Sequence, residues 1–134
     1  MLAVAVGGAL GTMVRYELAL AEPPGTGHFP WATFTVNVVG CLLLGVAATA
    51  LVEPWAPTRI LRPFVAVGVC GGLTTFSTWM VESVLLVRDD RAGLAVGYLV
   101  VSLVAGFVAV ACGVFATRRM LHRAVVAFDP RTDD

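Results

Sequence analysis

Long apolar runs dominate the sequence, and short polar stretches separate them. The runs cover residues 2–21, 31–52, 64–87 and 92–117. Each is about 20 residues or longer, which is the length that an α-helix needs to cross the hydrocarbon core of a bilayer. We therefore predict an all-α integral membrane protein with four transmembrane helices in one domain, residues 1–128, and a polar tail, 129–134.

Composition supports a membrane protein. Hydrophobic residues make up 58% of the chain and charged residues 13%, against about 25% charged in soluble domains. The formal net charge is zero, which argues against a nucleic-acid partner. No positive charge precedes the first run, so we interpret it as a mature helix and not as a cleavable signal.

Motifs for catalysis and for protein metal centres are missing from the sequence. Cys41, Cys70 and Cys112 lie in apolar runs without C-x-x-C spacing, so we interpret them as buried packing residues. Both histidines fall outside the runs, and no nucleophile–base pair or phosphate-binding loop with lysine is present. We predict that the protein is not an enzyme.

The third run is interrupted by polar residues at its centre, between Gly71 and Trp79. Two adjacent glycines and four hydroxyl residues occur there, and glycine destabilises a helix interior by about 1 kcal/mol relative to alanine. We predict that this helix breaks and that the break lies next to an ion site, because irregular backbone in a membrane is tolerated only where it is buried or lines a cavity. The alternative is a tightly packed helix whose hydroxyls bond to its own backbone.

Three polar residues in the spans are candidates for function. Asn37 either joins two helices or lines a site. Arg15 is either an anchor or part of an electropositive entrance for anions. Glu82 follows the predicted break, and the sequence leaves open whether it faces water, binds a proton or pairs with an arginine.

Two further patterns follow helical spacing. Phe76 and Trp79 are three residues apart and share a helix face, so their positive ring edges are able to stabilise an anion if the face lines a pore. Tyr98, Ser102 and Gly106 are spaced by four along the last span. The two hydroxyls form either a track of donors for an ion or an interhelical hydrogen-bond seam.

Small residues four apart predict close helix packing. The pairs are Gly7 and Gly11, Gly68 and Gly72, and Gly93 and Gly97. Four helices of this length enclose little interior, so we expect the chain to complete its site by oligomerising.

Arginines are distributed unequally between the two sides of the membrane. One predicted side carries Arg59, Arg62, Arg118, Arg119, Arg123 and Arg131. The other side carries Arg88 and Arg91, with Arg15 nearby. The positive-inside rule then places both termini in the cytoplasm.

Three blocks together resemble a known family. They are residues 7–16 (GGALGTMVRY), 33–40 (TFTVNVVG) and 71–79 (GGLTTFSTW). This combination is similar to the Fluc (CrcB) family of fluoride channels, and the resemblance covers nearly the whole chain. It implies a channel in the inner (plasma) membrane, surrounded by lipid, that lets cytoplasmic fluoride leave passively.

The resemblance also implies an assembly and a set of site residues. The family forms antiparallel dimers that enclose two pores and hold a structural sodium ion, here through the backbone carbonyls of Gly71 and Thr74. Its pore residues match Asn37, Phe76, Trp79, Tyr98 and Ser102, and its vestibule arginine matches Arg15.

Two positions depart from the family pattern: Trp79 replaces a phenylalanine and Gly106 replaces a hydroxyl residue. A dual-topology homodimer and a heterodimer with a sister subunit both remain open, as does a non-conducting partner subunit. A small proton-coupled multidrug exporter is the alternative from another class. It requires a central acidic residue in the first helix, and Glu17, near the end of that helix, fits poorly.

Overall fold

The computed structural model describes residues 1–22, 27–51 and 58–127, and nearly all of them are helical. The elements in chain order are α1 (Leu2–Ala21), α2 (Trp31–Ala50), α3 (Thr58–Arg62), η1 (Pro63–Val69), α4 (Cys70–Leu73), α5 (Phe76–Arg88) and α6 (Ala92–Ala127). Within the described ranges, four helical stretches are long and apolar enough to cross a membrane, the third being Ile60–Arg88, assembled from α3 to α5. The predicted all-helical fold with four apolar spans is confirmed.

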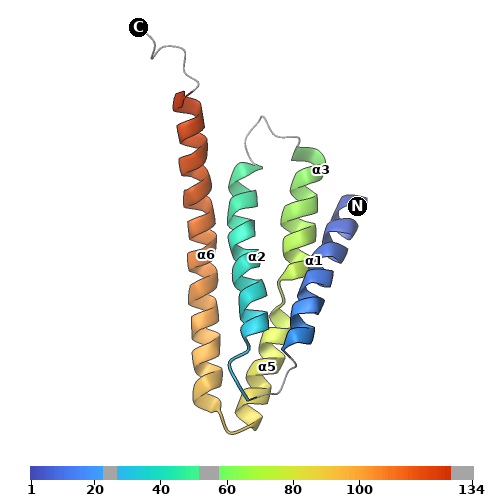
Figure 1. The fold of residues 1–134 in the computed structure, drawn as a ribbon, viewed down its shortest axis with the longest axis vertical. Coiled ribbons are helices and arrows are strands. Elements are labelled where there is room, and N and C mark those ends of the chain that lie inside the picture. The colour runs from blue at the N-terminus through green and yellow to red at the C-terminus, as the bar shows by residue number, and fades with distance from the viewer. Residues whose placement is uncertain (23–26, 52–57, 128–134) are drawn as a thin grey trace.

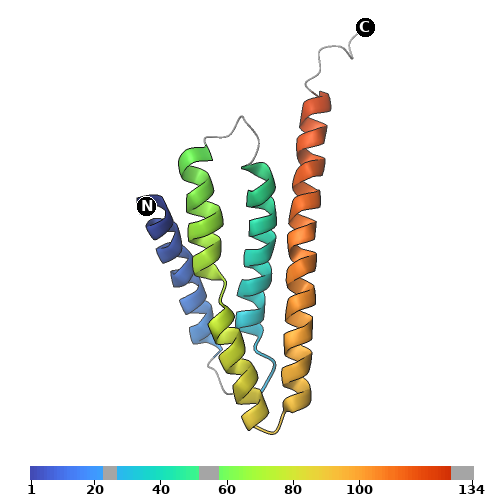
Figure 2. The same ribbon diagram turned by 180° about the vertical axis from the view of Figure 1, so that it is seen from behind.

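The spans lie side by side, with α1 and α6 at opposite edges of the bundle (Figures 1 and 2). The first half of the third span, η1 and α4, packs against α1, whereas α2 packs along α6. After α4 the neighbour changes, because α5 packs mainly against α6. The start of α1 and the end of α6 lie at the same end of the bundle, as an even number of crossings requires.

The observed helix bounds differ from the predicted spans mainly at α6. This helix continues to Ala127, past the predicted end of the fourth span at Thr117. Arginine is a good helix former, so Arg118 and Arg119 mark a change in polarity without ending the helix. The predicted connection between the second and third spans, residues 53–63, is shorter than expected, because its residues 58–62 form α3. Its residues 53–57, the predicted end of the second span at Val52 and the tail 129–134 lie outside the described residues.

The third span contains two extended residues between helical segments. α4 ends at Leu73, and Thr74 (φ −78°, ψ 150°) and Thr75 (φ −144°, ψ 124°) precede α5. Gly71 and Gly72 themselves remain helical within α4. The preceding segment η1 is a π-helix that begins at Pro63, a feature that no sequence pattern predicted. Such segments are rare and occur frequently near functional sites.

Glycines let α1 touch the third span backbone to backbone. A Cβ added at Gly7 would overlap the carbonyl oxygen of Phe64, and a Cβ at Gly72 would overlap the carbonyl oxygen of Gly8. The predicted pairs Gly7/Gly11 and Gly68/Gly72 therefore form one close crossing inside the chain.

A second close crossing joins α2 to α6. A Cβ at Gly45 would overlap the carbonyl oxygen of Val110, and one at Gly113 would overlap the carbonyl oxygen of Leu42. The sequence analysis did not identify this pair. By contrast, no described atom lies within 4 Å of a Cβ added at Gly93 or Gly97, so that predicted pair does not pack within the chain.

Replacing Gly72 by alanine should destabilise the fold, because the new methyl group must push α1 away from α4. Overpacking of this kind costs about 1–3 kcal/mol. The thermal unfolding midpoint in detergent measures the effect. Gly93→Ala is the matched control, since open space surrounds that position. Equal midpoints for the two variants would contradict the close crossing.

Candidate functional site

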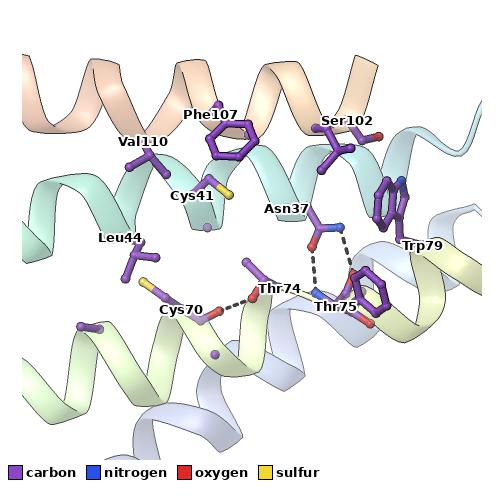
Figure 3. A pocket seen from close by; sticks show the side chains of 16 residues that line it. Asn37, Cys41, Leu44, Cys70, Thr74, Thr75, Trp79, Ser102, Phe107 and Val110 are labelled. Carbon is purple, nitrogen blue, oxygen red and sulfur yellow. Dashed lines mark hydrogen bonds between the residues drawn. The ribbon is translucent and has the colours of Figure 1, made fainter. Parts of the chain in front are cut away.

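Asn37 of α2 contacts the extended part of the third span directly. Its Nδ2 donates to the carbonyl oxygen of Thr75 at 3.0 Å, and its Oδ1 accepts from the Thr75 N–H at 2.8 Å (Figure 3). In a continuous helix, this N–H would donate to the carbonyl of Gly71. Asn37 therefore replaces backbone hydrogen bonds that the extended residues do not make, in a region where unpaired groups are costly.

The two threonines of the extended stretch complete the adjoining helix ends. Thr74 donates its hydroxyl to the carbonyl oxygen of Cys70 at 2.9 Å. Thr75 is the N-cap of α5, and its Oγ1 accepts from the N–H of Thr78 at 3.2 Å. Side chains of this kind commonly satisfy the first free N–H groups of a helix. The local sequence thus supports a new helix start at Phe76.

Arg15 of α1 contacts α4 just before the extended residues. Its Nε donates to the carbonyl oxygen of Gly72 at 3.1 Å, and the Thr12 hydroxyl donates to the same oxygen at 3.5 Å. This carbonyl would otherwise accept from the N–H of Phe76 in a continuous helix. Of the two roles that the sequence left open for Arg15, the contact supports an anchor.

Glu82 of α5 joins three helices through hydroxyl donors. Thr33 of α2 donates to its Oε1 at 2.7 Å, and Tyr98 of α6 donates to its Oε2 at 2.7 Å. Tyr98 is fully buried and packs edge-to-face on Phe29, with ring centroids 5.2 Å apart. In this chain Tyr98 is therefore an interhelical hydrogen-bond donor, one of the two alternatives that its spacing allowed.

A groove with a volume of about 450 Å³ lies between α2, the third span and α6 (Figure 3). Its walls are mostly apolar, with polar groups near the extended stretch. The predicted site residues that line it are Asn37, Gly71, Thr74, Phe76, Trp79 and Ser102, together with Gly106. Tyr98 and Arg15 do not line it. The structure thus brings six of the eight predicted site residues to one groove.

The sequence analysis did not identify three residues that contribute to the candidate site. The Thr33 hydroxyl donates to Glu82, and the backbone N–H of Thr75 donates to Asn37. The spacing of Thr33 and Asn37, four residues apart, places them on one helix face and was a usable signal. Cys41, interpreted only as a packing residue, lines the groove, and its sulfur lies 3.5 Å from the position of a Cβ at Gly106.

Comparison with known proteins gives a consistent match. A family model described as "CrcB-like protein, Camphor Resistance (CrcB)" matches residues 2–114. Fluoride-specific ion channel FluC 2 of Nocardia farcinica is 42% identical over 118 residues, covering 88% of this chain and 84% of the relative. Fluoride-specific ion channel FluC 1 of Mycobacterium bovis is 43% identical over 121 residues, covering 90% and 92%. The corresponding channel of Chlorobium luteolum is 42% identical over 118 residues, covering 88% and 92%.

The fold and the groove define a small multi-pass helical membrane protein. With the family model matching most of its length and these relatives so similar, the chain belongs to the CrcB-like family. The relatives are named as ion channels, which are not enzymes.

Proposed function

We propose that this protein is a passive, fluoride-selective channel that lowers the fluoride concentration of the cytoplasm. The observation that carries the proposal is family membership across residues 2–114, with relatives named as fluoride-specific ion channels. The groove adds chemical support, because it combines aromatic rings and hydroxyl groups in an apolar wall. Such a lining suits a small anion that gives up part of its hydration.

In this proposal, residues in and around the groove have defined parts. Phe76 and Trp79 present ring edges, which carry partial positive charge, and their centroids lie 5.5 Å apart. Ser102 donates a hydroxyl to the anion. Asn37 positions the extended stretch, and the charge of Arg15 favours anions near the entrance. Tyr98 contributes by fixing α6 to Glu82.

We further propose an antiparallel dimer. The first support is an exposed apolar surface around the extended stretch, where the Phe76 side chain is 71% exposed and that of Val67 60%. The second is Gly71, because no described atom lies within 4 Å of a Cβ added there, so another backbone is able to approach closely. A second subunit on this surface would convert the open groove into an enclosed path.

A structural sodium ion fits the backbone at this surface. The Thr75 N–H donates to Asn37, which frees the Gly71 carbonyl from its usual helical partner. Carbonyl oxygens of Gly71 and Thr74 from two subunits would supply the hard oxygen ligands that such a cation prefers. Within the described residues, no cluster of three His, Cys, Asp or Glu side chains offers another metal site. The ion would neutralise the carbonyl dipoles and hold the two subunits together.

The arginine distribution bears on whether the second subunit is a sister chain or another copy of this chain. Six arginines on one side against two or three on the other favour a single orientation in the cell membrane. A chain fixed in one orientation requires an oppositely oriented sister subunit, whereas a dual-topology chain pairs with itself. Reporter fusions at the C-terminus distinguish the two, since activity on both sides of the membrane would exclude the fixed orientation.

Fluoride efflux from liposomes that contain only this chain tests the proposal. A fluoride electrode should record rapid efflux, and chloride-loaded liposomes should release little. Absence of efflux from the chain alone, with efflux restored by a sister subunit, would identify it as a partner subunit. Absence of efflux in both preparations would overturn the channel proposal.

Gly106→Ser should increase fluoride efflux, because it adds a hydroxyl to the groove one turn beyond Ser102. Space exists for the side chain, since a Cβ at this position meets only the Cys41 sulfur, at 3.5 Å, an ordinary van der Waals distance. One hydrogen bond to an anion contributes about 1.5–3 kcal/mol, so an effect on the order of tenfold is expected. Gly106→Ala is the control without the hydroxyl, and equal rates for the two variants would contradict the prediction.

A further inference from the structure

The helix α6 is longer than a membrane crossing requires. Its 36 residues form a rod of about 54 Å, whereas a bilayer with its headgroups is about 40–45 Å thick. Charged residues 88–91 directly precede α6 and keep its start at one membrane surface, because charges are costly in hydrocarbon. The last turns of α6 therefore emerge at the other surface, and Figure 1 shows them continuing past the end of α2.

The emerging segment is strongly basic. It contains Arg118, Arg119 and Arg123 together with His122, and all four side chains are exposed. Along the helix axis, Arg118 lies about 39 Å and Arg123 about 47 Å from Ala92. With Ala92 at one membrane surface, these distances place the arginines at the level of the lipid phosphates on the opposite side.

No acidic side chain of the adjoining helices compensates this charge. Neither α6 nor α2, which packs along it, contains an aspartate or a glutamate. Arg119 and Arg123 are four residues apart, and like charges at this spacing destabilise a helix. The helix dipole favours cations only in the last turn, and Arg119 lies about two turns before the end at Ala127. An external anion between the two guanidinium groups would remove their repulsion.

The two arginines lie on the side of α6 that faces away from the bundle. Thr117 is buried, and a Cβ added at Gly113 would overlap a backbone carbonyl of α2, so these positions mark the packed side. Arg119 follows Thr117 by two residues, a rotation of about 200° that places it nearly opposite. Val108 and Phe115 precede Arg119 on this outer side and are 55% and 65% exposed. The basic patch thus continues directly from an exposed apolar strip.

This combination of charge and apolar surface fits an anionic phospholipid. A guanidinium group stays charged and presents a planar fork of donors that matches a phosphate. Anionic headgroups attract basic segments that follow a membrane helix. A soluble anion would contact the arginines alone, whereas a phospholipid has a phosphate at their level and an acyl chain at the level of the apolar strip.

We propose that Arg119 and Arg123 bind the headgroup phosphate of one anionic phospholipid, whose acyl chain lies along Val108 and Phe115. Arg118 adds to the attraction from the adjacent side of the helix. The bound lipid holds the end of α6 at the membrane surface. The site does not depend on fluoride conduction, so its test uses lipid binding and stability as readouts.

Native mass spectrometry of the full chain in detergent tests the site with phosphatidylglycerol and phosphatidylcholine of identical acyl chains. The wild type should retain phosphatidylglycerol preferentially, because phosphatidylcholine carries a cation beside its phosphate. Each arginine near an anionic headgroup contributes about fivefold in affinity, so the double variant Arg119→Gln/Arg123→Gln should bind phosphatidylglycerol about 25-fold more weakly. The matched control Arg88→Gln/Arg91→Gln removes the same charge at the other end of α6 and should bind it as the wild type does.

The thermal unfolding midpoint in lipid-supplemented detergent is the second measurement. A ligand that binds only the folded protein raises the midpoint. The wild type should therefore unfold at a higher temperature with phosphatidylglycerol than with phosphatidylcholine. The double variant Arg119→Gln/Arg123→Gln should match the wild type in phosphatidylcholine, because both side chains are exposed, and should gain nothing from phosphatidylglycerol.

Three results would overturn the lipid site. The first is equal affinity of the wild type and the double variant for phosphatidylglycerol. The second is a lower midpoint of the double variant in phosphatidylcholine, which would show that the arginines pair with a group of the protein itself, such as an aspartate of the tail 129–134. The third is release of the lipid by millimolar inorganic phosphate, which would identify a site for soluble anions. Fluoride efflux by the wild type is unaffected by any of these results, so the proposed function and the lipid site fail separately.

Discussion

Phe76→Ile should abolish fluoride efflux from liposomes while leaving the protein folded. The substitution removes the aromatic ring, whose positive edge contributes to the proposed anion path, and it retains an apolar side chain of moderate size. The ring is 71% exposed in the single chain, so its loss creates no cavity in the core of the subunit. Efflux measured with a fluoride electrode, and particle size measured by gel filtration in detergent, provide the two readouts.

Phe115→Ile is the matched control for this experiment. Phe115 is likewise an exposed aromatic residue, 65% exposed. It lies on α6 and does not line the groove. Its replacement should leave efflux close to that of the wild type. If Phe76→Ile conducted as well as Phe115→Ile, Phe76 would have no part in the path.

Asn37→Leu should destabilise the protein strongly and eliminate efflux. The variant loses both hydrogen bonds to Thr75 and leaves that residue's N–H and carbonyl without their side-chain partner. Each hydrogen bond contributes about 0.5–1.5 kcal/mol to stability, so the unfolding free energy should fall by about 1–3 kcal/mol in total. Unfolding in mixed micelles with increasing SDS measures the change.

Thr49→Val provides the comparison for Asn37. It removes from the same helix a hydroxyl that bonds only to its own backbone, at Gly45. Its effect on unfolding should be small. A similar, small effect for Asn37→Leu would mean that the extended stretch holds its conformation without the amide.

The positions of the four spans were predictable because apolar length is a local property of the sequence. The positions at which the third span changes from helical to extended backbone were harder to predict. Gly71 and Gly72 have the lowest helix propensity in the predicted break, yet both are helical. The extended residues are Thr74 and Thr75. The difference arises from Asn37, 38 positions away from Thr75 along the chain. A contact so distant leaves no periodic signal within the span.

The candidate site was predictable as a set of residues but not as a set of roles. Tyr98 and Ser102 share one spacing and one helix, and their spacing alone gave them the same two alternatives. The structure separates them, because Tyr98 meets the carboxylate of Glu82, whereas the Ser102 hydroxyl meets no described partner. The partner of Glu82 was undecided for the same reason, since it depends on how α2, α5 and α6 pack.

The change of neighbour along the third span has a mechanical consequence. The glycine crossing joins α1 closely to η1 and α4, whereas α5 packs mainly against α6, and α2 contacts both groups. Within this span, Thr74 and Thr75 link α4 to α5, and the Asn37 amide makes two hydrogen bonds to the backbone of Thr75. A bend of the third span at these two residues would therefore move α5 relative to α4 while leaving the crossing of α1 with η1 and α4 intact.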